Sequence, residues 1–251
     1  MTDAQPRFPR ILPAGDSALI LEFGEGISTG VHDLVVAMDR HLSEHPIRGV
    51  TECVPTYRSL MICHDPMVIR GRALGQALMD AARGLRTNDG TRRRWHVPVL
   101  YGHEAGLDLD ELAAMKGLST TELIGLHGSV DLRVYMIGFA PGFTYLGGLP
   151  DILHTPRLKV PRQMTPAGGI AIGGAQACVG ALPGPSGWRF LGRTPLRAFD
   201  PGRAEAFVFR AGDLVRFHPV TQAEADRLDA RSAAGEICAE QEIMPQSTQH
   251  P

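Results

Sequence analysis

Lysine is the scarcest charged residue in this chain: all but two of its 25 basic residues are arginines, the exceptions being Lys116 and Lys159. Chemistry that needs a lysine amine, such as Schiff-base formation, is therefore limited to two positions. The 27 acidic residues bring the formal net charge to −2. This near-neutral net charge does not indicate binding to nucleic acid or to an anionic membrane.

Cysteine and long apolar segments are scarce as well. The four cysteines show no C-x-x-C spacing, which argues against a zinc site and fits a reducing compartment. The apolar stretch at residues 11–23 is interrupted by Gly15, Asp16 and Glu22, so it matches neither a signal peptide nor a membrane span. We therefore expect a cytoplasmic protein without an intrinsic metal.

Common catalytic motifs are absent too. The chain has no G-x-x-x-x-G-K-[ST] loop for ATP phosphates and no G-x-S-x-G nucleophile turn. His41-Leu-Ser-Glu44-His45 does match the H-x-x-E-H pattern of some zinc enzymes. It lies in the last turn of a predicted helix before Pro46, where the helix dipole favours histidine, so we interpret the match as accidental.

Residues 1–95 alternate between strand and helix patterns in the order of a ferredoxin-like α/β domain. Apolar residues at helical spacing predict helices at 29–45 and 69–85. The central pair of strands forms a predicted hairpin in which Cys53 faces Cys63, and the arginine run at 92–94 is expected on a solvated strand edge. The strands are predicted at residues 17–23, 50–54, 59–63 and 95–100.

Residues 96–225 show a different sequence pattern. Two short helices are predicted at 108–115 and 119–126, the second with Ser119 and Glu122 as a capping box. From residue 134, short apolar runs between glycine and proline turns predict a β-barrel or sandwich. We treat 226–251 as a terminal region, in which a helix over 221–234 ends and a flexible tail follows.

The glycine-rich part of the second region carries the candidate chemistry. It contains 13 of the 29 glycines, between Gly138 and Gly202, together with Phe139, Phe143 and other aromatic residues. Glycine loops allow close approach to a ligand, and aromatic walls exclude water. Cationic donors in the same span predict a pocket for a small anion or a polar amide. These donors are Arg157, Lys159, Arg162 and Arg193.

Long runs in this sequence resemble one known family, that of the 5-oxoprolinase B subunit, also called allophanate hydrolase subunit 1, which includes an inhibitor of a sporulation histidine kinase. The resemblance covers nearly the whole chain. Its most specific part is residues 135–143, Tyr-Met-Ile-Gly-Phe-Ala-Pro-Gly-Phe. The other matching runs are GDSAL at 15–19, VPTYRSL at 54–60, the Pro-Arg pairs ending at Arg157 and Arg162, and GRTPL at 192–196.

The resemblance implies an α+β protein, with an N-terminal ferredoxin-like α/β domain and a cyclophilin-like β-barrel domain. It also implies work with partner subunits A and C, which together cleave 5-oxoproline to glutamate with ATP hydrolysis. Activity of the isolated chain is not expected. This sequence has Gly180-Ala181 where the family usually has Tyr-Pro.

The implied reaction opens a lactam, which is resonance-stabilised, and coupling to ATP suggests phosphorylation of the lactam oxygen. A transferring phosphoryl group needs Arg or Lys donors and usually Mg²⁺, and the ATP site can lie on a partner subunit. We expect Arg162 and Arg193 to act at this step, and His127, or His154, to transfer a proton. The expected contacts to substrate or phosphate are Tyr145, Arg157, Lys159, Gln176 and Trp188.

Two other functions remain open within the resemblance. The same module occurs in urea and allophanate degradation, and a related member binds and inhibits a histidine kinase. Prolyl isomerase activity is a third option from the fold alone, and a fold does not carry a function with it. The sequence leaves open which of the subunits binds ATP and substrate, and the stoichiometry of the complex.

Overall fold

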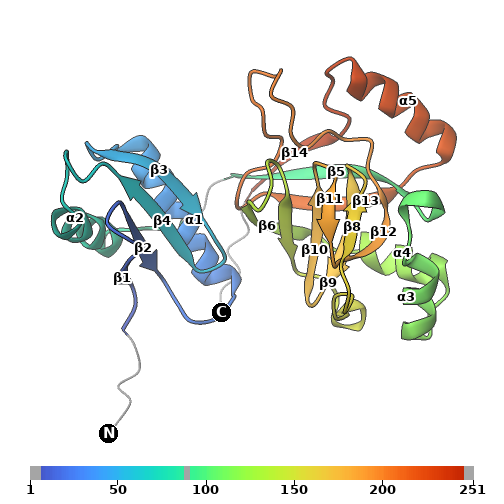
Figure 1. The fold of residues 1–251 in the computed structure, drawn as a ribbon, viewed down its shortest axis with the longest axis horizontal. Coiled ribbons are helices and arrows are strands. Elements are labelled where there is room, and N and C mark those ends of the chain that lie inside the picture. The colour runs from blue at the N-terminus through green and yellow to red at the C-terminus, as the bar shows by residue number, and fades with distance from the viewer. Residues whose placement is uncertain (1–6, 88–90, 246–251) are drawn as a thin grey trace, which may run out of the picture. The chain divides into compact units, whose positions relative to one another are not determined.

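The computed structural model describes residues 7–87 and 91–245, which divide after residue 90 into two compact units. We call residues 7–87 the α/β unit and residues 91–245 the barrel unit, and describe each by itself (Figure 1). Strand β5 (Thr91–Tyr101) lies wholly in the barrel unit, so the chain divides slightly before the boundary predicted at 95/96.

The α/β unit is a four-stranded antiparallel sheet in the order β1-β2-β4-β3, packed against two helices. Leucines and isoleucines at alternate positions of β2 and β4 meet apolar residues of both helices in one core, so both helices cover the same face. Ser28 caps the first helix by accepting from the Val31 N–H. The elements are β1 (Arg10–Pro13), β2 (Ala18–Glu22), α1 (Thr29–Glu44), β3 (Val50–Pro55), β4 (Ser59–His64) and α2 (Gly71–Arg83).

Two predictions for this unit need correction. The place beside β2 is taken by β1, which the sequence did not predict, and the strand expected at 95–100 belongs to the barrel unit instead. The ferredoxin-like fold is therefore not confirmed. Cys53 pairs with Ile62 rather than Cys63, because Thr56 N–H donates to the Ser59 carbonyl and closes a two-residue turn, which shifts the register by one residue.

The barrel unit is built around a closed seven-stranded barrel in the order β12-β9-β10-β7-β6-β13-β5, with β12 pairing back to β5. This architecture is consistent with the cyclophilin-like barrel that the resemblance implies. Closure occurs where Gly192 pairs with Tyr101, and a Cβ on Gly192 would lie 2.3 Å from the Leu100 carbonyl oxygen, so only glycine fits there. The barrel strands after β5 are β6 (Leu132–Ile137), β7 (Thr144–Gly147), β9 (Gly169–Gly173), β10 (Gln176–Gly180), β12 (Arg189–Arg193) and β13 (Leu214–Pro219).

Helices, the strand pair β8–β11 and the single strand β14 lie outside this barrel. The predicted capping box is confirmed at Ser119 and Glu122, and a second one forms at Thr221 and Glu224. Helix α4 ends against β13, where a Cβ on Gly128 would lie 2.9 Å from the Phe217 carbonyl oxygen. The remaining elements are η1 (His103–Ala105), α3 (Leu109–Lys116), α4 (Thr120–Gly128), η2 (Asp151–Leu153), β8 (Arg162–Thr165), β11 (Gly184–Ser186), α5 (Gln222–Ala233) and β14 (Glu240–Pro245).

Strand β14 overturns two expectations about the chain's charged segments. Residues 240–245 pair with β5 rather than forming a flexible tail, while 246–251 lie outside the described residues. Because β13 and β14 flank β5, the arginine run at its start is not a solvated edge. Arg93 forms a bidentate pair with Asp213, at 2.9 and 2.5 Å, and Arg94 pairs with Asp131 at 2.5 Å.

The described part of the chain holds no helix long and apolar enough to cross a membrane. Within the same residues, no group of three or more His, Cys, Asp or Glu side chains could hold a metal ion. In the H-x-x-E-H segment, the rings of His41 and His45 stack with their centroids 4.7 Å apart, and His45 Nδ1 lies 3.2 Å from the His41 carbonyl oxygen. These contacts place the two histidines within the last helical turn.

Candidate functional site

One row of side chains crosses four neighbouring strands on the outside of the barrel. Tyr145 on β7 is paired with Cys178 on β10, Cys178 with Ala171 on β9, and Ala171 with Phe190 on β12. Their sequence neighbours, such as Leu146 and Ala177, belong to the barrel interior. Because side chains alternate between the two faces of a strand, the row lies on the outer face, where the strands run side by side (Figure 1).

Aromatic rings gather on this row. The Tyr145 ring centroid lies 4.8 Å from that of Phe143 and 6.0 Å from that of Trp188. The Arg157 guanidinium carbon lies 4.5 Å from the centroid of the Trp188 ring, which is cation–π geometry. A Cβ on Gly173 would come within 3.0 Å of both Arg157 Cγ and the Trp188 ring, so glycine leaves room for the stack. We call these four residues, Phe143, Tyr145, Arg157 and Trp188, the aromatic platform.

The loop at one end of the platform holds an exposed aromatic residue in a strained conformation. Phe139 has φ of 69°, in the left-handed region, and is 76% exposed. Its ring still meets Phe143 edge-on at 5.7 Å. A bulky side chain in this backbone region carries strain that is typical of functional sites.

The polar groups of the platform are few. Burial raises the pKa of the Tyr145 phenol, while the positive charge of Arg157 opposes the increase. The phenol is therefore a neutral hydrogen-bonding group near pH 7. Burial also raises the pKa of the Cys178 thiol, which is 1% exposed, so this cysteine is not an activated nucleophile. The platform can stack on a flat polar group and bind an anion, but it has no acid–base pair of its own.

Both arginines expected to act in catalysis form ion pairs with carboxylates of the barrel unit. Arg162 donates to both oxygens of Asp108, at 2.9 and 2.7 Å, and Asp108 is 1% exposed. Arg193 donates to both oxygens of Asp229 on α5, at 3.0 and 2.7 Å. A guanidinium in a bidentate pair has its fork of donors engaged, so each of these arginines has less capacity to bind a ligand.

Neither candidate histidine reaches the platform. His127 is fully buried: its Nδ1 lies 2.8 Å from the Tyr101 hydroxyl, and its ring stacks on Phe217 at 4.8 Å. Burial lowers the pKa of His127 to about 4, so the imidazole is neutral near pH 7. The Nε2 atom of His154 lies 2.9 Å from the Leu149 carbonyl oxygen, which holds that ring in its own turn.

The other two predicted contacts, Gln176 and Lys159, are connected to the platform through neighbouring residues. Gln176 begins β10 and is paired with Gly173, the glycine below the Arg157–Trp188 stack. Lys159 is exposed on the segment that leads from Arg157 to β8. This segment is anchored by the Thr155 N–H donating to the Gly174 carbonyl at 3.0 Å. The structure thus brings together Tyr145, Arg157 and Trp188, while Gln176 is paired with Gly173 beneath the stack and Lys159 follows Arg157 closely in the sequence.

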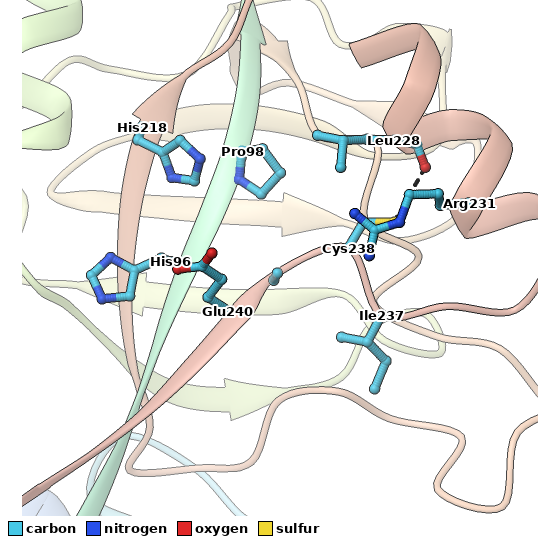
Figure 2. Close-up of a pocket in the computed structure, with 9 residues that line it drawn as sticks. His96, Pro98, His218, Leu228, Arg231, Ile237, Cys238 and Glu240 are labelled. Carbon is cyan, nitrogen blue, oxygen red and sulfur yellow. Dashed lines mark hydrogen bonds between the residues drawn. The ribbon is translucent and has the colours of Figure 1, made fainter. Parts of the chain in front are cut away.

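A separate pocket of about 250 Å³ lies where α5 and β14 meet β5 and β13 (Figure 2). Three of its polar groups have partners in or beside the pocket: Arg231 donates to Glu236 at 2.8 Å, His96 lies 3.2 Å from Glu242, and the Cys238 thiol donates to the Leu228 carbonyl oxygen at 3.2 Å. Burial lowers the pKa of His218, as does the nearby His96. None of the predicted site residues lines this pocket.

Asp108, Asp229 and Cys178 were missing from the predicted site. Asp108 lies 54 residues from Arg162 and Asp229 lies 36 residues from Arg193, so neither pairing has a local signal in the sequence. Cys178 could have been found from strand alternation in β10, had the register with Tyr145 been known.

Comparisons with known proteins agree with this architecture. The family model described as "Carboxyltransferase domain, subdomain C and D" matches residues 9–209. The chain is 36% identical over 222 residues to the 5-oxoprolinase B subunit of Bacillus subtilis (strain 168), covering 83% of this chain and 91% of that protein.

Two solved structures share the fold. The crystal structure of TTHA0988 is 34% identical with a TM-score of 0.73, and the match covers 81% of this chain but only 40% of that one. The urea carboxylase of Kluyveromyces lactis matches at 18% identity and a TM-score of 0.75, over 93% of this chain and 24% of that chain. On the extent of the family model and of the curated relative, this chain belongs to the carboxyltransferase subdomain C and D family and, within it, to the B subunits of 5-oxoprolinases.

Proposed function

We propose that this chain is the B subunit of an ATP-dependent 5-oxoprolinase, which opens 5-oxo-L-proline to L-glutamate together with subunits A and C in the cytoplasm. The observation that carries the proposal is the match to the Bacillus subtilis 5-oxoprolinase B subunit along 91% of that protein's length. In TTHA0988 the matching region is part of a much longer chain, which supports a module that works with further domains or subunits.

The aromatic platform fits the chemistry of such a substrate. A 5-oxoproline ring is small and flat, with a lactam amide and a carboxylate. Arg157 forms no ion pair within the described residues, so its guanidinium is available to a carboxylate beside the Trp188 ring. The neutral Tyr145 hydroxyl can donate to the lactam oxygen. We assign the platform to binding and orienting the lactam.

The described residues of this chain do not fit a Mg²⁺·ATP site. They contain no cluster of metal-ligating side chains, and Arg162 and Arg193 are held by Asp108 and Asp229. Walker-type glycine loops are absent from the sequence. We therefore propose that nucleotide binding and the groups that transfer protons belong to subunits A and C, which agrees with a platform that lacks an acid–base pair.

The function is tested by combining the full chain with its co-encoded subunits A and C and measuring glutamate formed from 5-oxoproline with ATP. Replacement of Arg157 by alanine should lower kcat/KM by about 10- to 100-fold, because one charge-assisted hydrogen bond to the substrate carboxylate is lost. The effect should appear mainly in KM. Arg157→Lys should recover part of the lost kcat/KM, since lysine keeps the positive charge but lacks the two parallel N–H donors of a guanidinium.

The matched control is Arg210→Ala, which removes an exposed arginine paired with the exposed Glu205 in the same unit and should leave kcat/KM unchanged. If the Arg157 and Arg210 variants have equal activity, the platform does not bind the substrate. Absence of glutamate from the wild-type complex, with both partners present, would contradict the proposed function itself.

A further inference from the structure

A cavity of about 390 Å³ opens in the α/β unit, between the β1–β2 turn, the end of β4 and the first turn of α2. Its volume lies in the range of small-molecule sites. The turn at its mouth contains Gly15 and Asp16 of the GDSAL run, which the proposed function does not use. On the strand side, the wall is formed by Ile11, Pro13 and Leu19. This side suits an apolar group.

The opposite side of the cavity is the N-terminus of α2. Its N-cap residue, Arg70, makes no side-chain hydrogen bond to the helix, and the first bond of the helical series runs from Leu74 N–H to the Arg70 carbonyl. The N–H groups of Gly71, Arg72 and Ala73 therefore have no acceptor within residues 7–87 and 91–245. Three free donors at the positive end of a helix dipole favour an anion.

A buried histidine without hydrogen-bond partners also lines the cavity. His64 is the last residue of β4 and shares the face of Leu60 and Ile62, which packs against the helices. It is 4% exposed, its Nδ1 is buried without a hydrogen-bond partner, and its Nε2 has no partner among the described residues either. Its Nε2 lies 3.6 Å from the position that a Cβ on Gly71 would take, so this edge of the ring faces the first turn of α2.

The charges around the cavity favour an anion over a cation. Arg72 lines the cavity, is exposed, and forms no ion pair among the described residues. Asp16 is the one acidic residue in the lining. It is exposed on the turn, and a single carboxylate is a poor cation site. It also disfavours a ligand with negative charge at both ends.

We propose that this cavity binds a small organic anion with one oxyanion head group, a carboxylate or a phosphate. The head-group oxygens accept hydrogen bonds from the first-turn N–H groups of α2, from His64 Nε2 and from Arg72. The apolar part of the ligand packs against Ile11 and Leu19. This site lies within the α/β unit and does not depend on the assignment of the aromatic platform in the barrel unit.

The test is a titration of the ¹⁵N-labelled full chain, at constant ionic strength, with butyrate and separately with inorganic phosphate. Saturable shifts of the Gly71, Arg72 and Ala73 amide signals are expected with at least one probe. Tighter binding of butyrate identifies a carboxylate ligand, and tighter binding of phosphate identifies a phosphoryl ligand. Absence of saturable shifts with both probes overturns the proposal.

Variants of the two groups that contact the anion sharpen the test. Arg72→Ala should weaken binding about tenfold, while Arg83→Ala, at the other end of the same helix, should not change it. His64→Phe keeps the ring and removes its nitrogens, so it should weaken binding without lowering Tm. Equal affinities of the Arg72 and Arg83 variants, or unchanged binding by His64→Phe, contradict the assignment.

Discussion

Replacement of Asp108 by alanine should lower the free energy of unfolding of the barrel unit by about 3–5 kcal/mol. Asp108 is 1% exposed and accepts three hydrogen bonds, two from Arg162 and one of 2.7 Å from the Phe190 N–H. Its loss leaves a partly buried guanidinium without a counter-charge and a buried N–H without an acceptor. Both tryptophans, Trp95 and Trp188, lie in the barrel unit, so urea unfolding followed by tryptophan fluorescence reports this unit alone.

Asp229 provides the matched control for Asp108. It forms the same bidentate pair with an arginine, and the two arginines have similar exposure, 29% for Arg162 and 25% for Arg193. The Asp229 side chain, however, is 41% exposed, so Asp229→Ala should cost no more than about 1 kcal/mol. The double variant Asp108→Leu/Arg162→Met should recover much of the loss, because it leaves no unpaired charge. Equal losses from Asp108→Ala and Asp229→Ala would show that burial of the carboxylate is not decisive.

These two ion pairs also show where prediction from sequence reached its limit. Arg162 and Arg193 could be placed in the glycine-rich segment from the sequence, but their availability to a ligand depends on carboxylates brought close only by the fold. Arg157 and Trp188 are also far apart in the sequence. Composition places both of them in the glycine-rich segment, but only the fold brings them together beside Gly173.

The elements with local signals were predicted well. Helix α4 is set by the capping box of Ser119 and Glu122, and α1 ends before Pro46, both of which are readable in the sequence. Strand β14 has no such signal, because most of its residues are exposed and its stability comes from pairing with β5. The same holds for the assignment of β5 to a sheet: its apolar pattern predicts a strand, but the partners of a strand depend on tertiary packing.

The barrel unit should lose stability as the pH falls from about 6.5 towards 4, and His127 should account for about 3 kcal/mol of that loss. Burial lowers the pKa of His127 from 6.5 to about 4. Above pH 6.5 the imidazole is neutral in both the folded and the unfolded chain, so its contribution is fully present. As the pH falls, the unfolded chain takes up a proton that the folded chain does not, which stabilises the unfolded state by about 2 kcal/mol at pH 5 and about 3 kcal/mol at pH 4.

The double variant Tyr101→Phe/His127→Phe isolates this contribution. It removes both partners of the buried 2.8 Å hydrogen bond and the unpaired Nε2 of His127, while a ring remains to stack on Phe217. Its stability at pH 7 should match or exceed that of the wild type, because no buried polar group is left alone. At pH 5 it should exceed the wild type by about a further 2 kcal/mol, measured by urea unfolding at each pH. Tyr101→Phe alone should keep the wild-type pH dependence, since His127 remains buried. If the double variant keeps that dependence as well, the acid sensitivity of the barrel unit comes from groups other than His127.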